Sequence, residues 1–302
     1  MKKSVIIGIT SFLVFGLIWY LFFKKYDYVV TFKDKTAPGT IFQGALDWGD
    51  GLKKSDSIES KIVSKMAFST IVQELKTEQS TIVFNWFFEG VNDSITGVKV
   101  GVIDSNNSIV NRIMLPFSSE GVKQFSINKV VSFKNSLDKH LAKHKVKINT
   151  ASNIPAQFCA YIPIESSLQS KGQHMIAINS YIMGFLQKNN LEVVGRPFIE
   201  VNYWDIQNQK IKYNFCFPIE ELEMLPYHKE IKFKKISAKK ALKATYKGNY
   251  RTSDRAWFLL YDYALRNNIK IENKPFEIFY NNPFMGGNEL DWKAEIFMPI
   301  IE

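Results

Sequence analysis

One carboxylate near the end of the chain stands out because of its neighbours. In the segment 293–300, strand alternation places Glu295 on the same face as Lys293 and Phe297, opposite an apolar face. A carboxylate among aromatic rings can hold a cation through its charge and through attraction to the ring faces. Candidate aromatic walls precede this strand: Tyr246, Tyr250, Trp257, Tyr280 and Trp292.

Two interpretations of Glu295 are open. In a closed cleft, loss of water raises the pKa of its carboxyl group, and general acid–base catalysis would need such a shift. At an exposed sheet edge, a salt bridge with Lys293 or another lysine is expected instead. The aromatic residues are open to the same choice, because the spacing of Trp257 on a helix is also that of an ordinary core face.

Other patterns that carry chemistry are weak. His140 and His144 have the spacing of metal ligands on a helix, but the neighbouring lysines favour a solvated helix end. The sequence has no Gly-x-Ser-x-Gly motif, no Walker loop and no dinucleotide-binding motif. We therefore predict neither a metal site nor a cofactor, and these patterns suggest no catalytic residue.

The segments that would position these residues form an internal repeat of two similar copies. Residues 186–201 and 264–279 share an Asn-Asn pair followed by Pro-Phe, and the two copies end in FCFPI at 215–219 and IFMPI at 296–300. The apolar periodicity predicts a β-α-β-β unit in each copy, with the first strand of the second copy at 231–245. Two such copies can enclose a cleft along their shared axis.

Alignment of the two endings places Asn214 opposite Glu295, so only the second copy carries the carboxylate. Tyr161, near a strand of the first copy, is a further ligand-binding candidate by symmetry. The sequence thus predicts an α+β fold whose candidate site lies between two similar halves.

The first 25 residues predict a single membrane anchor. Residues 4–23 carry no charge and are about as long as the ~20 residues needed to cross a lipid bilayer. A cleaved signal peptide is disfavoured, because bulky residues at 19–23 stand where small ones are expected. Lysines flank both ends, and although their balance leans towards a cytoplasmic body, the side of the membrane stays undecided.

The chain of 302 residues has a net charge of +10 at pH 7, with many of its lysines between residues 229 and 247. Such a segment is attracted to anionic lipid, although a solvated protein surface is the favoured interpretation. No helix-turn-helix, zinc-finger or RNP-type pattern accompanies the lysines, so nucleic-acid binding is not expected. Cys159 and Cys216 stand in apolar segments typical of buried free thiols, and the sequence leaves open a bridge between them.

The region 28–148 reads as a strand, a helix that starts near Pro38, antiparallel strands and a long helix at about 122–145. The strands are expected at 61–75, 81–90, 96–104 and 109–116. This order, with TFKDKTAPGTIFQGALDW at 31–48, resembles the helix-grip fold of the polyketide cyclase/START-like family. That resemblance implies a hydrophobic-ligand cavity, reduced here because the region is short. A polar linker at 149–155 then divides the chain into an anchor (1–25) and domains at 26–150 and 151–302.

The segment 244–300 resembles the second half of the gyrase-inhibitor-like effector-binding domain, found in AraC- and MerR-type regulators and in stand-alone proteins. The matching features are Gly248 and Tyr250 before a helix, the strand 275–280, the Asn-Asn-Pro turn at 281–283, and Glu295 followed by a proline. The resemblance extends over 155–302. It implies that the matching glutamate faces a central cleft, where it binds cationic ligands or, in some members, assists hydrolysis.

These patterns favour a membrane-anchored protein that binds a small amphipathic, aromatic or cationic molecule between its two copies. The alternative is a hydrolase of reactive small molecules in which Glu295 is the acid or base and Tyr250 assists. A third possibility is an interaction protein that uses its basic surface while side chains close the cleft. A transcription factor is not expected, because no DNA-binding segment is present. Ligand identity, protein partners and oligomeric state stay open.

Overall fold

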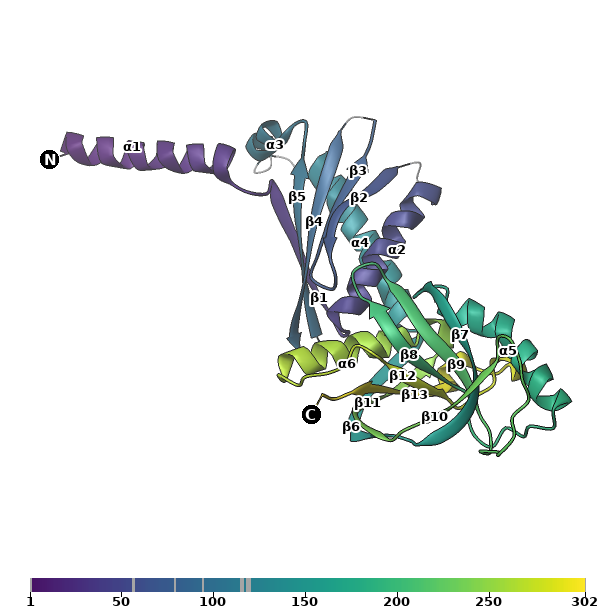
Figure 1. Cartoon of the computed structure of the whole chain (residues 1–302). Helices are drawn as coiled ribbons and strands as arrows, with labels where there is room; N and C mark the ends of the chain where they lie inside the picture. The colour runs from purple at the N-terminus through teal and green to yellow at the C-terminus, as the bar shows by residue number, and fades with distance from the viewer. Residues whose placement is uncertain are drawn as a thin grey trace. The chain divides into compact units, whose positions relative to one another are not determined.

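The computed structural model describes all residues except 1, 56–57, 79, 94, 115–116, 118–120 and 302. The chain divides into two compact units, one of residues 1–35 with 41–138 and one of residues 36–40 with 139–302. Each unit contains one antiparallel sheet together with helices, so the fold is α+β as the sequence predicts (Figure 1).

The N-terminal segment is one apolar helix. Helix α1 spans Lys2–Ile18 and continues as a π-helical turn, η1, at Trp19–Phe23. Val5–Phe23 has 19 residues, a mean hydropathy of 2.3 and no buried portion. At 1.5 Å per residue it is about 28 Å long, close to the thickness of a bilayer core. Length and composition therefore suffice for crossing a membrane.

The sheet of the first unit has the strand order β1-β5-β4-β3-β2. Its strands are β1 (Tyr28–Asp34), β2 (Glu59–Met66), β3 (Thr70–Lys76), β4 (Thr81–Asn92) and β5 (Ile95–Asp104). Helices α2 (Pro38–Ser55) and α4 (Val122–Leu141) cover one face, and α2 begins at the predicted proline. Aromatic rings fill the space beneath them, for example Trp86 and Phe133 with centroids 5.1 Å apart. A packed aromatic core thus occupies the place where the helix-grip resemblance implies a cavity.

Two strand predictions in this unit are wrong. The segment 61–75 is two strands, because Phe68 has a positive φ of 60° in the turn between them. The described part of 109–116 belongs to helix α3 (Ser108–Met114), while 115–116 lie outside the described residues. In α3 the Arg112 side chain forms a buried ion pair with Asp27, and this tertiary contact overrides the β propensity of the isoleucines and valine around it.

The second unit is built on an eight-stranded sheet in the order β10-β7-β9-β8-β12-β13-β11-β6. The strands are β6 (His144–Ile154), β7 (Gln157–Ser167), β8 (Phe198–Asp205), β9 (Lys210–Pro218), β10 (Lys232–Ile236), β11 (Lys239–Gly248), β12 (Phe276–Phe279) and β13 (Lys293–Pro299). Helices α5 (Lys171–Lys188) and α6 (Asp254–Arg266) accompany it, with three short 3-10 helices, η2 (Tyr250–Thr252), η3 (Pro283–Met285) and η4 (Glu289–Asp291).

The elements β7-α5-β8-β9 and β11-α6-β12-β13 follow the same order, and their strands occupy corresponding positions counted from opposite edges of the sheet. Their helices also end alike. Asn190 and Asn268 both have a φ of 53°. The side chains of Asn189 and Asn267 each donate a hydrogen bond of 2.8 Å to the carbonyl group four residues earlier.

Two sequence interpretations fail in this unit. Most of the predicted linker at 149–155 belongs to β6, which pairs with β11, because the free edge of β11 offers backbone partners to this polar segment. The strand expected at 231–245 is interrupted, and its parts, β10 and β11, lie near opposite ends of the strand order. Cys159 and Cys216 are free buried thiols.

On one face of the large sheet, side chains from all eight strands pack against one another. A core cluster draws one residue from each of the eight strands: Ile154, Cys159, Phe198, Cys216, Ile236, Ala241, Phe276 and Phe297. The opposite face carries the aromatic residues packed against α6, for example Trp204 and Trp257 with centroids 5.4 Å apart. Because side chains alternate along a strand, neighbouring residues of β13 belong to different environments.

Candidate functional site

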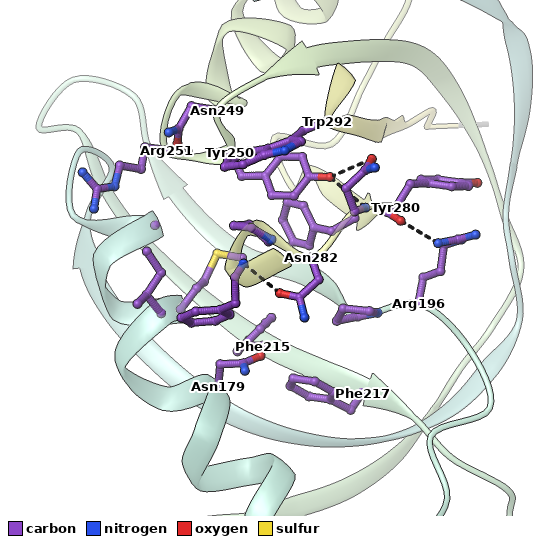
Figure 2. Close-up of a pocket in the computed structure, with 18 of the residues that line it drawn as sticks. Asn179, Arg196, Phe215, Phe217, Asn249, Tyr250, Arg251, Tyr280, Asn282 and Trp292 are labelled. Atoms are coloured by element: carbon purple, nitrogen blue, oxygen red, sulfur yellow. Dashed lines mark hydrogen bonds between the residues drawn. The ribbon is translucent and has the colours of Figure 1, made fainter. Parts of the chain in front are cut away.

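A cleft of about 630 Å³ opens on the helix-bearing side of the large sheet. It lies between α5, the end of β9, the turn at 249–251 and the loop 280–292 (Figure 2). The residues that line it include Met175, Asn179, Met183, Arg196, Phe215, Phe217, Asn249, Tyr250, Arg251, Phe279, Tyr280, Glu289 and Trp292.

The apolar part of the cleft follows from two simple periodicities. On β9, Phe215 and Phe217 are two residues apart and therefore project to the same face of the strand. On α5, Met175, Asn179 and Met183 follow each other at intervals of four and form one stripe along the helix. The stripe faces the phenylalanines across the cleft, so this part of the lining is apolar apart from the amide of Asn179.

Tyr250 and Trp292 form an aromatic wall. Their ring centroids are 5.9 Å apart, and Tyr250 also packs against Phe279 at 4.8 Å. The Tyr250 hydroxyl donates to the carbonyl oxygen of Lys293 (2.8 Å) and accepts from the backbone N–H of Asn281 (3.0 Å). Burial raises the pKa of Tyr250 to about 12, so its hydroxyl stays protonated and acts as a structural link.

Trp292 fixes the loop in front of this wall, since its indole N–H donates to the carbonyl oxygen of Gly286 at 3.2 Å. Gly286 and Gly287 have positive φ values of 71° and 95°, a conformation that side chains with a Cβ rarely adopt. The loop therefore depends on these two glycines for its path and on Trp292 for its position.

Tyr280 lies between two cations at one end of the cleft. The Arg196 guanidinium is 4.4 Å from its ring centroid and the Lys293 ammonium 4.1 Å, so both groups make cation–π contacts. Arg196 also donates a hydrogen bond of 2.7 Å to the Tyr280 carbonyl oxygen. The Tyr280 hydroxyl donates to Glu295 Oε2 at 2.8 Å, which connects the cleft to that carboxylate.

The charged side chains that line the cleft are two arginines and one glutamate, Arg196, Arg251 and Glu289. The carboxylate of Glu289 accepts a hydrogen bond of 2.7 Å from the Asn249 side chain. Arg251 is exposed, and its side chain packs on Gly172 at the start of α5, where an added Cβ would come within 2.9 Å of it. The lining therefore has one more positive than negative group.

A fully buried ion pair supports the back of the cleft. Lys171 donates 2.8 Å hydrogen bonds to Glu277 Oε1 and to Ser253 Oγ, and Ser253 donates to Glu277 Oε2 at 2.7 Å. The Lys171 and Glu277 side chains are both 0% exposed, and the ammonium lies 4.5 Å from the Trp257 ring centroid. Because Lys171 starts α5 and Ser253 precedes α6, the cluster joins both helices to β12.

Glu295 does not line the cleft. It lies on the other side of β13, where its oxygens contact Lys243 (3.0 Å) and Lys293 (2.8 Å), and its side chain is 13% exposed. Burial alone would raise the pKa of this carboxyl group, but hydrogen bonds from Lys293, Lys243 and Tyr280 outweigh burial and lower the pKa to about 2. The prediction of a raised pKa is therefore wrong, and the salt bridge with Lys293 named as the alternative is present.

Of the other ligand-binding residues predicted from the sequence, some line the cleft and some lie elsewhere. Tyr250, Tyr280 and Trp292 line the cleft. Tyr246 is fully buried and stacks on His144, and Trp257 is fully buried next to Lys171. Tyr161 packs against the eight-strand cluster, away from the cleft lining.

His144 also corrects an expectation, because it is 8% exposed and does not belong to a solvated helix end. Burial first and the nearby Arg255 second lower the pKa of His144 to about 4.

Sequence inspection missed much of the lining. The α5 stripe and the Phe-x-Phe pair on β9 carry the signal of ordinary core faces, and nothing local distinguishes a face that borders a cavity. Arg196 and Arg251 stand in loops, where charged residues are common. Only the three-dimensional arrangement of α5 against the loop 280–292 reveals these residues as one site.

The pairing of Glu295 yields a testable pH dependence. Its folded-state pKa of about 2 lies below the ordinary value of about 4.3 for glutamate, so its stabilising effect is complete above that value. The effect is lost as pH falls through about 2. We expect Glu295→Gln to cost about 1 kcal/mol of unfolding free energy at pH 7 and less at pH 3. Denaturant titrations at both pH values measure this, and an equal cost at the two would contradict the assignment.

Residues 173–301 match the family model described as the GyrI-like small molecule binding domain. Comparison of the sequence with curated proteins gives no match.

Among solved structures, the C-terminal domain of EcmrR is 16% identical, with 53% of this chain and 98% of that chain covered and a TM-score of 0.43. SAV2435 bound to tetraphenylphosphonium is 10% identical, covers 51% of this chain and 94% of its own, and has a TM-score of 0.37. A hydrolase from Listeria innocua is 11% identical, with coverages of 56% and 98% and a TM-score of 0.32.

The matched segment runs from the first turn of α5 to the end of β13, and of the residues that line the cleft only Gly172 lies outside it. The part of the chain that forms the cleft is therefore GyrI-like in sequence.

Proposed function

We propose that this chain is a membrane-anchored binding protein whose GyrI-like segment holds a small, flat aromatic molecule in the cleft described above. The size of the cleft and the residues that line it support this proposal. Its volume of about 630 Å³ lies within the range of about 300–1,000 Å³ that is usual for small-molecule sites. Its interior is apolar and aromatic, and a few amides and charged groups lie around it, as ligand orientation requires.

The charges favour a neutral or anionic ligand over a cationic one. Arg196 and Arg251 lie towards opposite ends of the cleft and outnumber the one carboxylate, Glu289. Arg196 donates a hydrogen bond to the Tyr280 carbonyl oxygen, and Glu289 accepts one from Asn249. The expectation of a cationic ligand rested on Glu295, which has two lysine partners on the other side of β13. An acidic group on an aromatic ligand would meet an arginine at either end.

Binding is better supported than hydrolysis. With a pKa of about 2, Glu295 stays ionised near neutral pH, so it is a poor general acid and a weak general base. Tyr250, the residue expected to assist, uses its hydroxyl in two backbone contacts. Neither group has the protonation state or the free position that the hydrolase alternative needs.

The apolar helix Val5–Phe23 would cross the cell membrane once, with the side of the soluble body left open. The first unit, with its aromatic core, would be a helix-grip-like spacer and no second binding module. The shared order of β7-α5-β8-β9 and β11-α6-β12-β13 supports an origin by duplication.

Charge-matched dyes test the function. The full chain in phosphatidylcholine nanodiscs is titrated with anilinonaphthalene sulfonate, an anionic aromatic dye, and with the cation acridine orange, and empty nanodiscs are subtracted. We expect saturable binding of the anion, weakened by Arg251→Ala about 3- to 10-fold, because a charged hydrogen bond contributes about 1 kcal/mol or more. Glu289→Gln should leave that affinity equal or higher.

Lys247→Ala, which removes an exposed charge away from the cleft lining, serves as the control and should change neither affinity. Stronger binding of the cation, or equal effects of Arg251→Ala and Lys247→Ala, would contradict the proposal.

A further inference from the structure

We infer that α3 is a second membrane-contacting element, which places its exposed apolar face in the interfacial layer of the bilayer beside the end of the spanning helix. The inference goes beyond ligand binding and rests on the proposed anchoring by α1. Its consequence is that the first unit is held on the lipid surface in one orientation, because it is attached at two points.

The polarity of α3 is the reverse of what a water-exposed helix shows. Its apolar side chains face outward, with exposed fractions of 45% for Ile109, 59% for Val110, 49% for Ile113 and 50% for Met114. Phe117, just beyond the helix, is 83% exposed. Arg112, the charged residue of the helix, is buried. An apolar patch of this kind on a surface marks a binding partner.

The polar side chains of α3 are all used inside the protein. Arg112 Nε donates to Asp27 Oδ1 at 2.8 Å, and the Ser108 hydroxyl donates to the same oxygen. The Asn111 side chain donates to Asp104 Oδ2 at 2.8 Å. These contacts fix the rotation of α3 about its axis, so that no polar side chain of α3 itself is left to cover its outward face.

Two hydrogen bonds place α3 at the end of the apolar helix. Arg112 Nη1 donates to the carbonyl oxygen of Leu21 at 2.8 Å, and the Tyr20 hydroxyl donates to the carbonyl oxygen of Arg112 at 3.1 Å. Leu21 belongs to the last turn of the segment Val5–Phe23. If that segment spans a bilayer, a helix within hydrogen-bonding distance of Leu21 lies at the depth of the lipid headgroups.

The same end of the helix has the residues expected at a lipid–water boundary. Trp19 is 60% exposed and aromatic, and Lys24 and Lys25 follow the apolar segment. The Lys24 ammonium contacts the Tyr20 ring at 4.7 Å from its centroid. The apolar face of α3 thus continues the apolar surface of η1, which argues for lipid as its occupant.

The test uses the full chain in vesicles of phosphatidylcholine with brominated acyl chains. A fluorophore is attached through Ile113→Cys or Val110→Cys, and through Val63→Cys as the control. Val63 is equally exposed, at 50%, but lies on β2 at the other edge of the sheet. The wild-type chain, whose two cysteines are buried, is the labelling blank. Flotation with the vesicles reports the anchoring by α1 separately.

We expect the bromolipid to quench the labels at 113 and 110 about twofold or more, and the label at 63 hardly at all, since interfacial helices insert about 5–10 Å. Flotation with equal quenching at all three positions, or with none, would overturn the role of α3 while leaving the anchor intact. Failure to float would overturn both the anchor and this inference, but not ligand binding in the cleft.

Discussion

Replacement of Lys171 by methionine is expected to destabilise the second unit by about 3–5 kcal/mol, the usual cost of removing one partner from a buried ion pair. Of the two hydrogen-bond donors that the described residues offer to the fully buried Glu277 carboxylate, the variant leaves Ser253 alone. Lys171 also contacts the Trp257 ring, so its loss removes a cation–π interaction inside the core. Thermal or denaturant unfolding of the full chain, followed by tryptophan fluorescence, measures the change.

Two further variants separate loss of the pair from loss of a lysine. Lys188→Met changes an exposed lysine at the other end of the same helix and should leave stability within about 0.5 kcal/mol. Lys171→Met combined with Glu277→Leu removes both charges and should recover most of the loss, because an apolar replacement of a buried pair is often neutral. A double variant less stable than Lys171→Met would show that the pair is not the source of the effect.

Trp292→Ala is expected to weaken binding of anilinonaphthalene sulfonate by about 10- to 100-fold, which corresponds to about 1.4–2.7 kcal/mol. The indole is half of the aromatic wall formed with Tyr250, and it holds the loop through Gly286. Truncation therefore removes contact area and also releases the loop that closes one side of the cleft. Equilibrium titration in nanodiscs measures the affinity.

Tyr203→Ala is the matched control for Trp292→Ala. Tyr203 is an aromatic residue on β8 that is 51% exposed and is not among the residues lining the cleft. Its replacement should leave dye affinity unchanged. If both variants weaken the dye equally, the dye is bound to exposed aromatic surface in general and the cleft is not its site.

The sequence patterns predict most helices and strands of the second unit but do not show which side of the sheet carries the candidate site. Alternation along β13 correctly separates Glu295 from Ala294 and Ile296, which are fully buried on the α6 side. It does not tell which side opens to a ligand, because alternation shows only which residues share a face of the strand. The cleft lies on the α6 side because α5 and the loop 280–292 leave space there. On the Glu295 side, the cluster around Phe297 fills part of the space.

The chemistry of Glu295 illustrates why local pattern is insufficient for a pKa. The direction of the shift depends on partners distant in sequence, and Lys243 is on β11 while Tyr280 follows β12. Helix α3 is a similar case, since Arg112 pairs with Asp27, which is far away along the chain. By contrast, a helix long and apolar enough to cross a membrane could be predicted at Val5–Phe23, because length and hydropathy are local properties.

Methionine methyl resonances report directly whether a small aromatic molecule occupies the cleft between α5 and the loop 280–292. The full chain, labelled with ¹³C at the methionine methyl groups, is titrated in nanodiscs with anilinonaphthalene sulfonate. Met175 and Met183 line the cleft, whereas Met298 is buried in the sheet and Met66 lies in the first unit. We expect saturable shifts at Met175 and Met183 alone among these four; shifts confined to Met298 or Met66 would show that the dye does not bind in the cleft.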